Sequence, residues 1–237
     1  MKFVDAPTEG VFRVSRGDRD VFSPADWRNA GRGRFDDPIK YVERREHELF
    51  RTVYCATHLT GSFVETLQTI QPLLTSIAEL DEGGPISDRL EGHARIDLEG
   101  AVPVDWRTRR HWGRAQINTS GRFVDVVAAE SVASVRNTSS LARLALELRL
   151  DDIDISAIVG PKRALTQAIA RHIYTSIPDC CGIRYVSRFS TDQDFECWAA
   201  FDDRVQFEVL TANEPVLITT PGFEEAMKIL QLYAEYD

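Results

Sequence analysis

Segments with the pattern of strands and segments with the pattern of helices follow one another along this chain without a regular alternation. Residues 11–16 (VFRVSR) alternate apolar and polar side chains, as a strand does. Residues 49–57 (LFRTVYCAT) are rich in residues that favour strands. Three later strands are predicted at GIRYVSR, FECWAAFD and VQFEVL. Because strict βαβ alternation is missing, we predict one α+β domain over residues 1–237, with helices packed on a central sheet.

The predicted helices have clear apolar faces. In TGSFVETLQTIQPLL, four apolar residues at offsets of 0, 4, 7 and 11 form one helical face: Phe63, Leu67, Ile70 and Leu74. In GPKRALTQAIARHIYTS, Pro161 lies near the expected helix start, where proline is tolerated. Short strands are expected over 101–127, helices around 129–147, and a last helix from about Phe223 to Tyr233.

Composition excludes several classes of protein. The net charge of −9 argues against a basic face of the kind that binds nucleic acid. Apolar runs such as VDVVAA at 124–129 are far shorter than the roughly 20 residues that span a bilayer. The N-terminal MKFVDAPTEG has no apolar stretch typical of a secretory signal. We therefore expect a cytoplasmic protein that binds neither a membrane nor nucleic acid directly.

Cysteine and histidine spacing gives no metal-binding motif. The cysteines form no CxxC pair: Cys55, Cys180, Cys181 and Cys197. The histidines form no HxxxH or HExxH pair: His47, His58, His93, His111 and His172. We expect no metal site, and reduced, buried thiols.

Two arginines near the N-terminus are candidates for binding an anion. Arg13 lies inside the first predicted strand, where it either extends along a sheet edge or presents its guanidinium to a phosphate or ribose. Arg34 lies in GRGRFDDP, whose glycines let the backbone and the guanidinium approach an anion closely. This segment is not a GxxxxGK[ST] loop, so it gives no support to nucleotide triphosphate hydrolysis.

Tyr54 and Glu65 frame the start of the first predicted helix. Ser62 and Glu65 fit a capping box, with Ser62 as the N-cap, and spacing alone favours this structural role. Alternatively, Glu65 faces a cleft and stabilises positive charge that develops on a ribose. Ser187, in GIRYVSR, is either a small strand residue or a hydrogen-bond donor to a ligand. No GxSxG motif accompanies it, so it does not resemble a hydrolase nucleophile.

Four segments, taken in order, resemble the RES domain family, which is named for its Arg, Glu and Ser. They are VFRVSR, GRGRFDDP, VYCATHLTGSFVETL and ALTQAIARHIYTSIPDCCGIRYVSRFS. Val186 stands where the family commonly has proline. The resemblance covers roughly 11–75 and 160–201. Residues 76–159 are expected to be an insertion or added strands and helices.

The resemblance implies an ADP-ribosyltransferase-like mixed sheet and an enzyme that degrades NAD by phosphorolysis or hydrolysis. Members are commonly toxins of toxin–antitoxin pairs, neutralised by an Xre-like antitoxin. Carried over by position, Glu65 would act on the nicotinamide ribose and Tyr54 would pack on the nicotinamide side. Arg13 and Arg34 would hold the phosphates or ribose, and Ser187 would fix the dinucleotide. NAD is then the substrate rather than a resident cofactor.

Other functions remain open at the level of sequence. A mono-ADP-ribosyltransferase would transfer ADP-ribose to a protein, whereas a phosphorylase would use inorganic phosphate. A non-catalytic module would bind a nucleotide or a partner on the same scaffold, and a homodimer is one assembly open to the chain. A nuclease-type toxin is disfavoured because the acidic chain has no evident basic groove.

Overall fold

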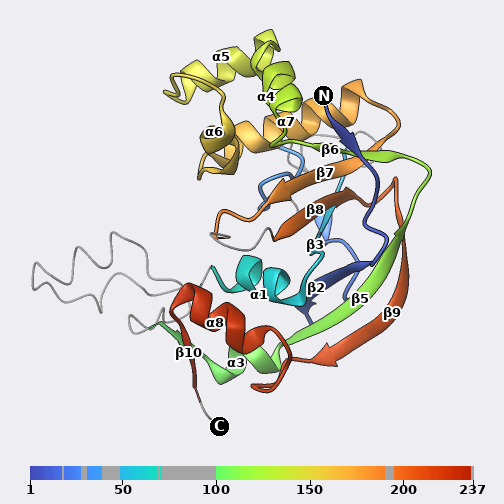
Figure 1. The fold of residues 1–237 in the computed structure, drawn as a ribbon, viewed down its shortest axis with the longest axis vertical. Helices are drawn as coiled ribbons and strands as arrows, with labels where there is room; N and C mark the ends of the chain where they lie inside the picture. The colour runs from blue at the N-terminus through green and yellow to red at the C-terminus, as the bar shows by residue number, and fades with distance from the viewer. Residues whose placement is uncertain are drawn as a thin grey trace, which may run out of the picture.

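The computed structural model describes residues 1–17, 19–27, 31–38, 49–68, 70, 100–189 and 195–235. The strands of the main sheet are β1 (Phe3–Val4), β2 (Val11–Arg16), β3 (Thr52–Ala56), β5 (Arg110–Asn118), β6 (Arg122–Asp125), β7 (Cys180–Val186), β8 (Glu196–Phe201) and β9 (Gln206–Pro215). They lie in the order β1-β6-β7-β8-β3-β2-β5-β9 (Figure 1). Strands β6 and β7 run parallel, and the other neighbours run antiparallel. A second, two-stranded sheet pairs β4 (Ala101–Val102) with β10 (Tyr233–Ala234).

The described helices are α1 (Leu59–Leu67), α3 (Val104–Thr108), α4 (Ala129–Arg136), α5 (Ser139–Glu147), α6 (Ile155–Val159), α7 (Arg163–Ser176) and α8 (Phe223–Leu230). The predicted α+β class and mixed sheet are confirmed. Pro161 lies just before α7, whose N-cap is Lys162. The last helix is shorter than predicted, because Gln231 adopts a left-handed conformation and residues 233–234 pair with β4.

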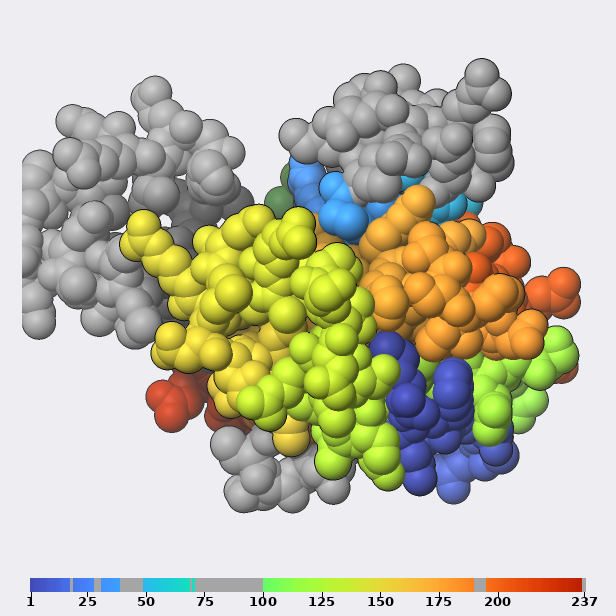
Figure 2. Space-filling view, turned by 90° about the horizontal axis from the view of Figure 1, so that it is seen from above, coloured from blue at the N-terminus to red at the C-terminus, as the bar shows by residue number. Residues whose placement is uncertain are grey.

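Two helical groups cover one face of the sheet. Helices α4 to α7 pack on one half through a core that includes Ile169, Ile173 and Ile183. Helices α1, α3 and α8 pack near β2 through Phe63, Trp106 and Phe223. Figure 2 shows the first group from above, where the yellow-green and yellow surface of residues 129–159 lies beside the orange segment that includes α7. The candidate site lies on this face, where the two groups meet.

The middle of the chain is part of the sheet. Residues 100–159 supply β5 and β6, and β5 lies between β2 and β9. The same residues supply α4, α5 and α6. Residues 76–99 of the expected insertion lie outside the described residues.

Candidate active site

The register of the central strands determines which side chains share the covered face. Tyr54 of β3 pairs with Ala199 of β8, and Tyr185 of β7 pairs with Cys197 of β8. Because side chains alternate between faces along a strand, Tyr54 and Tyr185 lie on the same face. Ser187 follows two residues after Tyr185, just beyond the end of β7. The period of two therefore brings Tyr54, Tyr185 and Ser187 to one side of the sheet.

Glu65 reaches this face from α1. The helix begins at Leu59, with His58 as the N-cap and no side-chain cap bond. The capping-box interpretation is therefore wrong: the Ser62 hydroxyl instead donates to the Phe12 carbonyl of β2, at 2.7 Å. This bond from a buried serine fixes α1 on the sheet, and Glu65 follows three residues later in the same helix.

Two hydroxyl groups meet the Glu65 carboxylate. The Ser187 hydroxyl donates to Oε1 at 2.6 Å, which is the short distance typical of a bond to a charged oxygen. The Tyr185 hydroxyl donates to Oε2 over a longer distance of 3.4 Å, and Gln68 Nε2 lies 3.5 Å from the same atom. Burial, followed by the Glu65 charge, raises the pKa of Tyr185 well above its usual value, so this tyrosine stays a neutral donor. Oε1 is thus strongly held, whereas Oε2 has only long contacts.

Ser187 is itself held in place. Its side chain is buried, and its backbone N–H donates to the Phe195 carbonyl at 3.1 Å. Its hydroxyl oxygen also accepts a bond from the Phe189 N–H at 3.3 Å. The serine therefore has little freedom to leave Glu65.

Tyr54 supports the GRGRFDDP loop with its hydroxyl. That hydroxyl donates to Asp36 Oδ1 and accepts from the Phe35 N–H, both at 2.8 Å. Burial, followed by the Asp36 charge, raises the pKa of Tyr54 well above its usual value. Gly33 lies so close to the ring that an added Cβ would come within 2.3 Å of the hydroxyl oxygen, which explains why only glycine fits there.

Arg34 extends from this loop toward Tyr185. Its guanidinium carbon lies 5.7 Å from the centre of the Tyr185 ring and 5.6 Å from that of Phe35. Nη2 donates to the Ile158 carbonyl of α6. Nε and Nη1 are buried and have no hydrogen-bond partner among the residues that the structure describes. These two unpartnered donors fit an anionic ligand, because leaving buried donors unsatisfied is costly.

Arg13 lies apart from the other predicted site residues. Phe12 pairs with Ala56, so the alternation along β2 places Arg13 beside Cys55, on the face opposite Tyr54. Its Nη1 donates to the Ser23 carbonyl at 2.9 Å, and its side chain is buried in the interior of the sheet rather than at an edge. Burial, followed by the nearby Arg19, lowers its pKa to about 10. Thus Arg34, Tyr54, Glu65 and Ser187 share one face, and Arg13 does not.

Two further residues belong to this arrangement and were not singled out from the sequence. Tyr185 contacts Glu65 through its hydroxyl. Because it lies two residues before Ser187, strand alternation predicts that it shares the face of Ser187. Asp36 accepts from Tyr54 and, through Oδ2, from the Gly33 N–H at 2.6 Å. The acidic pair after GRGRF was a weaker signal, since surface loops are often acidic.

The described residues show neither a metal-binding cluster nor a membrane-spanning helix. No group of three or more His, Cys, Asp or Glu side chains there is arranged to hold a metal ion. No helix in that part of the chain is both long and apolar enough to cross a membrane.

Together these features define an α+β protein in which an acid, hydroxyl groups and an arginine meet on one face of a mixed sheet. The sequence model of the RES domain matches residues 11–218, so the chain belongs to the RES domain family.

Among solved structures, the fold is similar to a chain in the crystal structure of the M. tuberculosis MbcT–MbcA toxin–antitoxin complex. The TM-score is 0.51 and the sequence identity 12%, and the match covers 97% of this chain and 92% of that chain. At 12% identity, this similarity shows that the two chains share a fold. No curated protein matches the sequence.

Proposed function

We propose that this RES domain protein is a toxin-like enzyme that consumes NAD by cleaving the nicotinamide–ribose bond. Family membership and the likeness to a chain of a toxin–antitoxin complex support this proposal. The same likeness supports a protein antitoxin as the natural partner, and we propose an antitoxin of the Xre type.

The observation that carries the proposal is the Glu65 carboxylate, which Ser187 holds firmly by Oε1 and which makes only long contacts through Oε2 with the described residues. Cleavage of the nicotinamide–ribose bond develops positive charge on the ribose, in an oxocarbenium-like transition state. A fixed carboxylate stabilises that state more than the ground state, and this difference accelerates the reaction. Ser187 orients the carboxylate through Oε1. Oε2, which has only long contacts, is then available to a ribose hydroxyl or to the acceptor.

Arg34 and Tyr54 serve substrate binding in this proposal. Nε and Nη1 of Arg34 are the donors that the diphosphate of the dinucleotide would use. A guanidinium that is already held in place binds the diphosphate without further ordering, so Arg34 contributes to the affinity for NAD. Tyr54 would pack on the nicotinamide side while its hydroxyl holds Asp36.

The acceptor of ADP-ribose is either inorganic phosphate or water. With phosphate, an oxygen of the dianion attacks the anomeric carbon, nicotinamide leaves as the neutral base, and ADP-ribose 1″-phosphate forms. With water, the products are ADP-ribose, nicotinamide and a proton. A protein acceptor would make the chain a mono-ADP-ribosyltransferase instead.

The test is NAD consumption by the purified protein, with and without inorganic phosphate. We expect nicotinamide release to fall at least about a hundredfold in Glu65→Gln, which keeps the shape and removes the charge. Glu130→Gln, a change of the same kind at an exposed position of α4, is the matched control and should keep full activity.

The reaction products separate the possible outcomes. A requirement for phosphate identifies a phosphorylase, and a lysate protein that gains the mass of ADP-ribose identifies a transferase. Intact NAD in every tube, including one supplemented with lysate, would overturn the enzyme proposal in favour of a binding module.

A further inference from the structure

Gln167 of helix α7 connects this helix to the loop that carries Arg34. The proposed mechanism gives this glutamine no role. Gln167 Nε2 donates to two carbonyl oxygens of the loop, those of Gly31 at 2.8 Å and Gly33 at 2.9 Å. The Gln167 side chain is buried, with 9% of its surface exposed. A single amide group thus bridges two peptide units immediately before Arg34.

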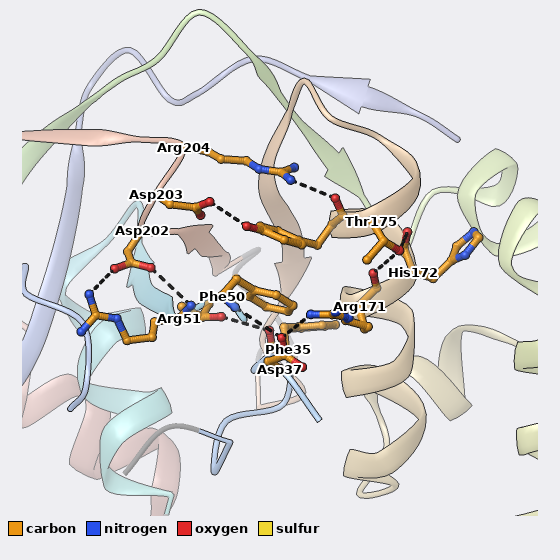
Figure 3. A network of polar contacts seen from close by, with 12 residues as sticks. Phe35, Asp37, Phe50, Arg51, Arg171, His172, Thr175, Asp202, Asp203 and Arg204 are labelled. Carbon is orange, nitrogen blue, oxygen red and sulfur yellow. Dashed lines mark hydrogen bonds and ion pairs between the residues drawn. The ribbon is translucent and has the colours of Figure 1, made fainter. Parts of the chain in front are cut away.

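A second contact from α7 holds the far end of the same loop. Arg171, one helical turn after Gln167, donates to Asp37 Oδ2 at 2.6 Å. Asp37 is buried and also accepts from the Phe50 N–H at 3.3 Å, as Figure 3 shows. Two residues on one face of α7 therefore fix the loop on both sides of Arg34.

This fastening has a consequence for the Arg34 guanidinium. Gly31 adopts a positive φ of 85°, so the loop turns sharply before Arg34. With its carbonyls held by Gln167 and its N–H at Gly33 held by Asp36, the turn keeps Nε and Nη1 of Arg34 buried and unpartnered. A looser loop would let the guanidinium turn toward water and satisfy those donors there.

We propose that Gln167 is a positioning residue that keeps Arg34 ready for the diphosphate of the dinucleotide. The inference rests on the proposed function, because that function supplies the ligand. Gln167 does not touch the substrate in this proposal. It acts on Arg34 through the carbonyls of Gly31 and Gly33. Because Gln167 already orders this loop in the free protein, substrate binding does not have to supply the entropy cost of ordering it.

The test compares Gln167→Met with the wild-type protein. Methionine has nearly the same length and fills the buried space, but it cannot donate to the two carbonyls. We expect the KM for NAD and the Kd for ADP-ribose, measured by calorimetry, each to rise about tenfold. The kcat for nicotinamide release should change less than about threefold, since Glu65 is untouched. Gln167→Asn, whose amide is one methylene too short to reach both carbonyls, should act in the same direction.

Thr166→Val is the matched control. Thr166 is the buried neighbour of Gln167 on α7, and its hydroxyl bonds within the helix to the Arg163 carbonyl. This variant tests destabilisation of α7 without loss of the loop contacts. We expect its melting temperature to fall while its KM and its Kd for ADP-ribose stay at the wild-type values.

A fourth variant, Arg34→Met, separates this inference from the proposed function. If Arg34→Met weakens ADP-ribose binding and both Gln167 variants do not, the positioning role is wrong and the proposed function stands. An equal rise of KM in Thr166→Val would also overturn the positioning role, because helix stability would explain it. A wild-type protein that binds neither NAD nor ADP-ribose overturns both proposals.

Discussion

The two oxygens of Glu65 lie in different surroundings. Oε1 accepts a short bond from a buried serine, whereas Oε2 faces Tyr185 and Gln68 at distances near the limit of a hydrogen bond. A carboxylate held on one oxygen keeps its orientation and retains acceptor capacity on the other. At the scale of a single residue, Ser187 therefore determines where the charge of Glu65 points.

Removal of the Ser187 hydroxyl should lower catalysis without unfolding the protein. A hydrogen bond to a charged group contributes about 1.5–3 kcal/mol, so we expect Ser187→Ala to lower kcat about tenfold to a hundredfold. The measurement is nicotinamide release beside Ser140→Ala, an exposed serine of α5. Wild-type kcat in Ser187→Ala would show that Glu65 needs no such orientation.

Strand β2 shows what alternation does at the scale of one element. Its neighbours β3 and β5 cover both of its edges, so each of its side chains faces one side of the sheet or the other. Phe12 and Val14 face the side of the candidate site, and Arg13 faces the side of Cys55. Because Arg13 lies one position away from Phe12 and Val14 in the strand, it faces the side of the sheet opposite to Tyr54 and Glu65.

This placement predicts unequal effects for the two arginines. We expect Arg34→Met to raise the KM for NAD at least about tenfold, because its unpartnered donors are on the face of Glu65. Arg13→Met should raise KM less than about threefold and lower the free energy of unfolding through loss of the Ser23 contact. Steady-state kinetics and urea unfolding measure the two effects. A larger KM effect at Arg13 would support the phosphate-binding role that the family resemblance implies.

Local patterns predicted individual elements better than their arrangement. Alternation and apolar spacing were enough for β2, β3 and α7, because these signals lie within a few neighbouring residues. The first predicted helix is longer than the observed one: α1 ends at Leu67, so Ile70 lies beyond it, and Leu74 lies outside the described residues. The sheet order could not be predicted, because β3 pairs with β8 across well over half of the chain. The two-residue strands β1, β4 and β10 have no local pattern at all. Glu65 was singled out, yet its contact with Ser187, 122 residues away, depends on that order.

Across the whole molecule, all four thiols are withdrawn from solvent. Cys55, Cys180, Cys181 and Cys197 are free and buried, with at most 5% of each exposed. Burial raises the pKa of Cys55 to about 12, and it raises that of Cys197 well above its usual value. These two groups therefore remain protonated thiols at neutral pH, and the protonated form is a poor nucleophile.

Thiol alkylation should consequently report global unfolding. At pH 8 we expect native protein to take up almost no iodoacetamide, and urea-denatured protein to take up four labels, as measured by mass spectrometry. The thiolate fraction of Cys55 increases about tenfold per pH unit below its raised pKa, but at pH 8 it is still very small, so labelling of the native protein should stay slow. Rapid labelling of the native chain would contradict the burial of these cysteines.

The strand order also determines when Glu65 and Ser187 can come together during synthesis of the protein. Glu65 leaves the ribosome long before Ser187, and at about 5–20 residues per second the 122 residues between them take about 6–24 s to make. Strand β3 likewise waits for β8 before its second edge is paired. The nascent chain therefore carries Glu65 without Ser187 while about half of these 237 residues are made, and the bond between the two side chains forms only after β7 has been synthesised.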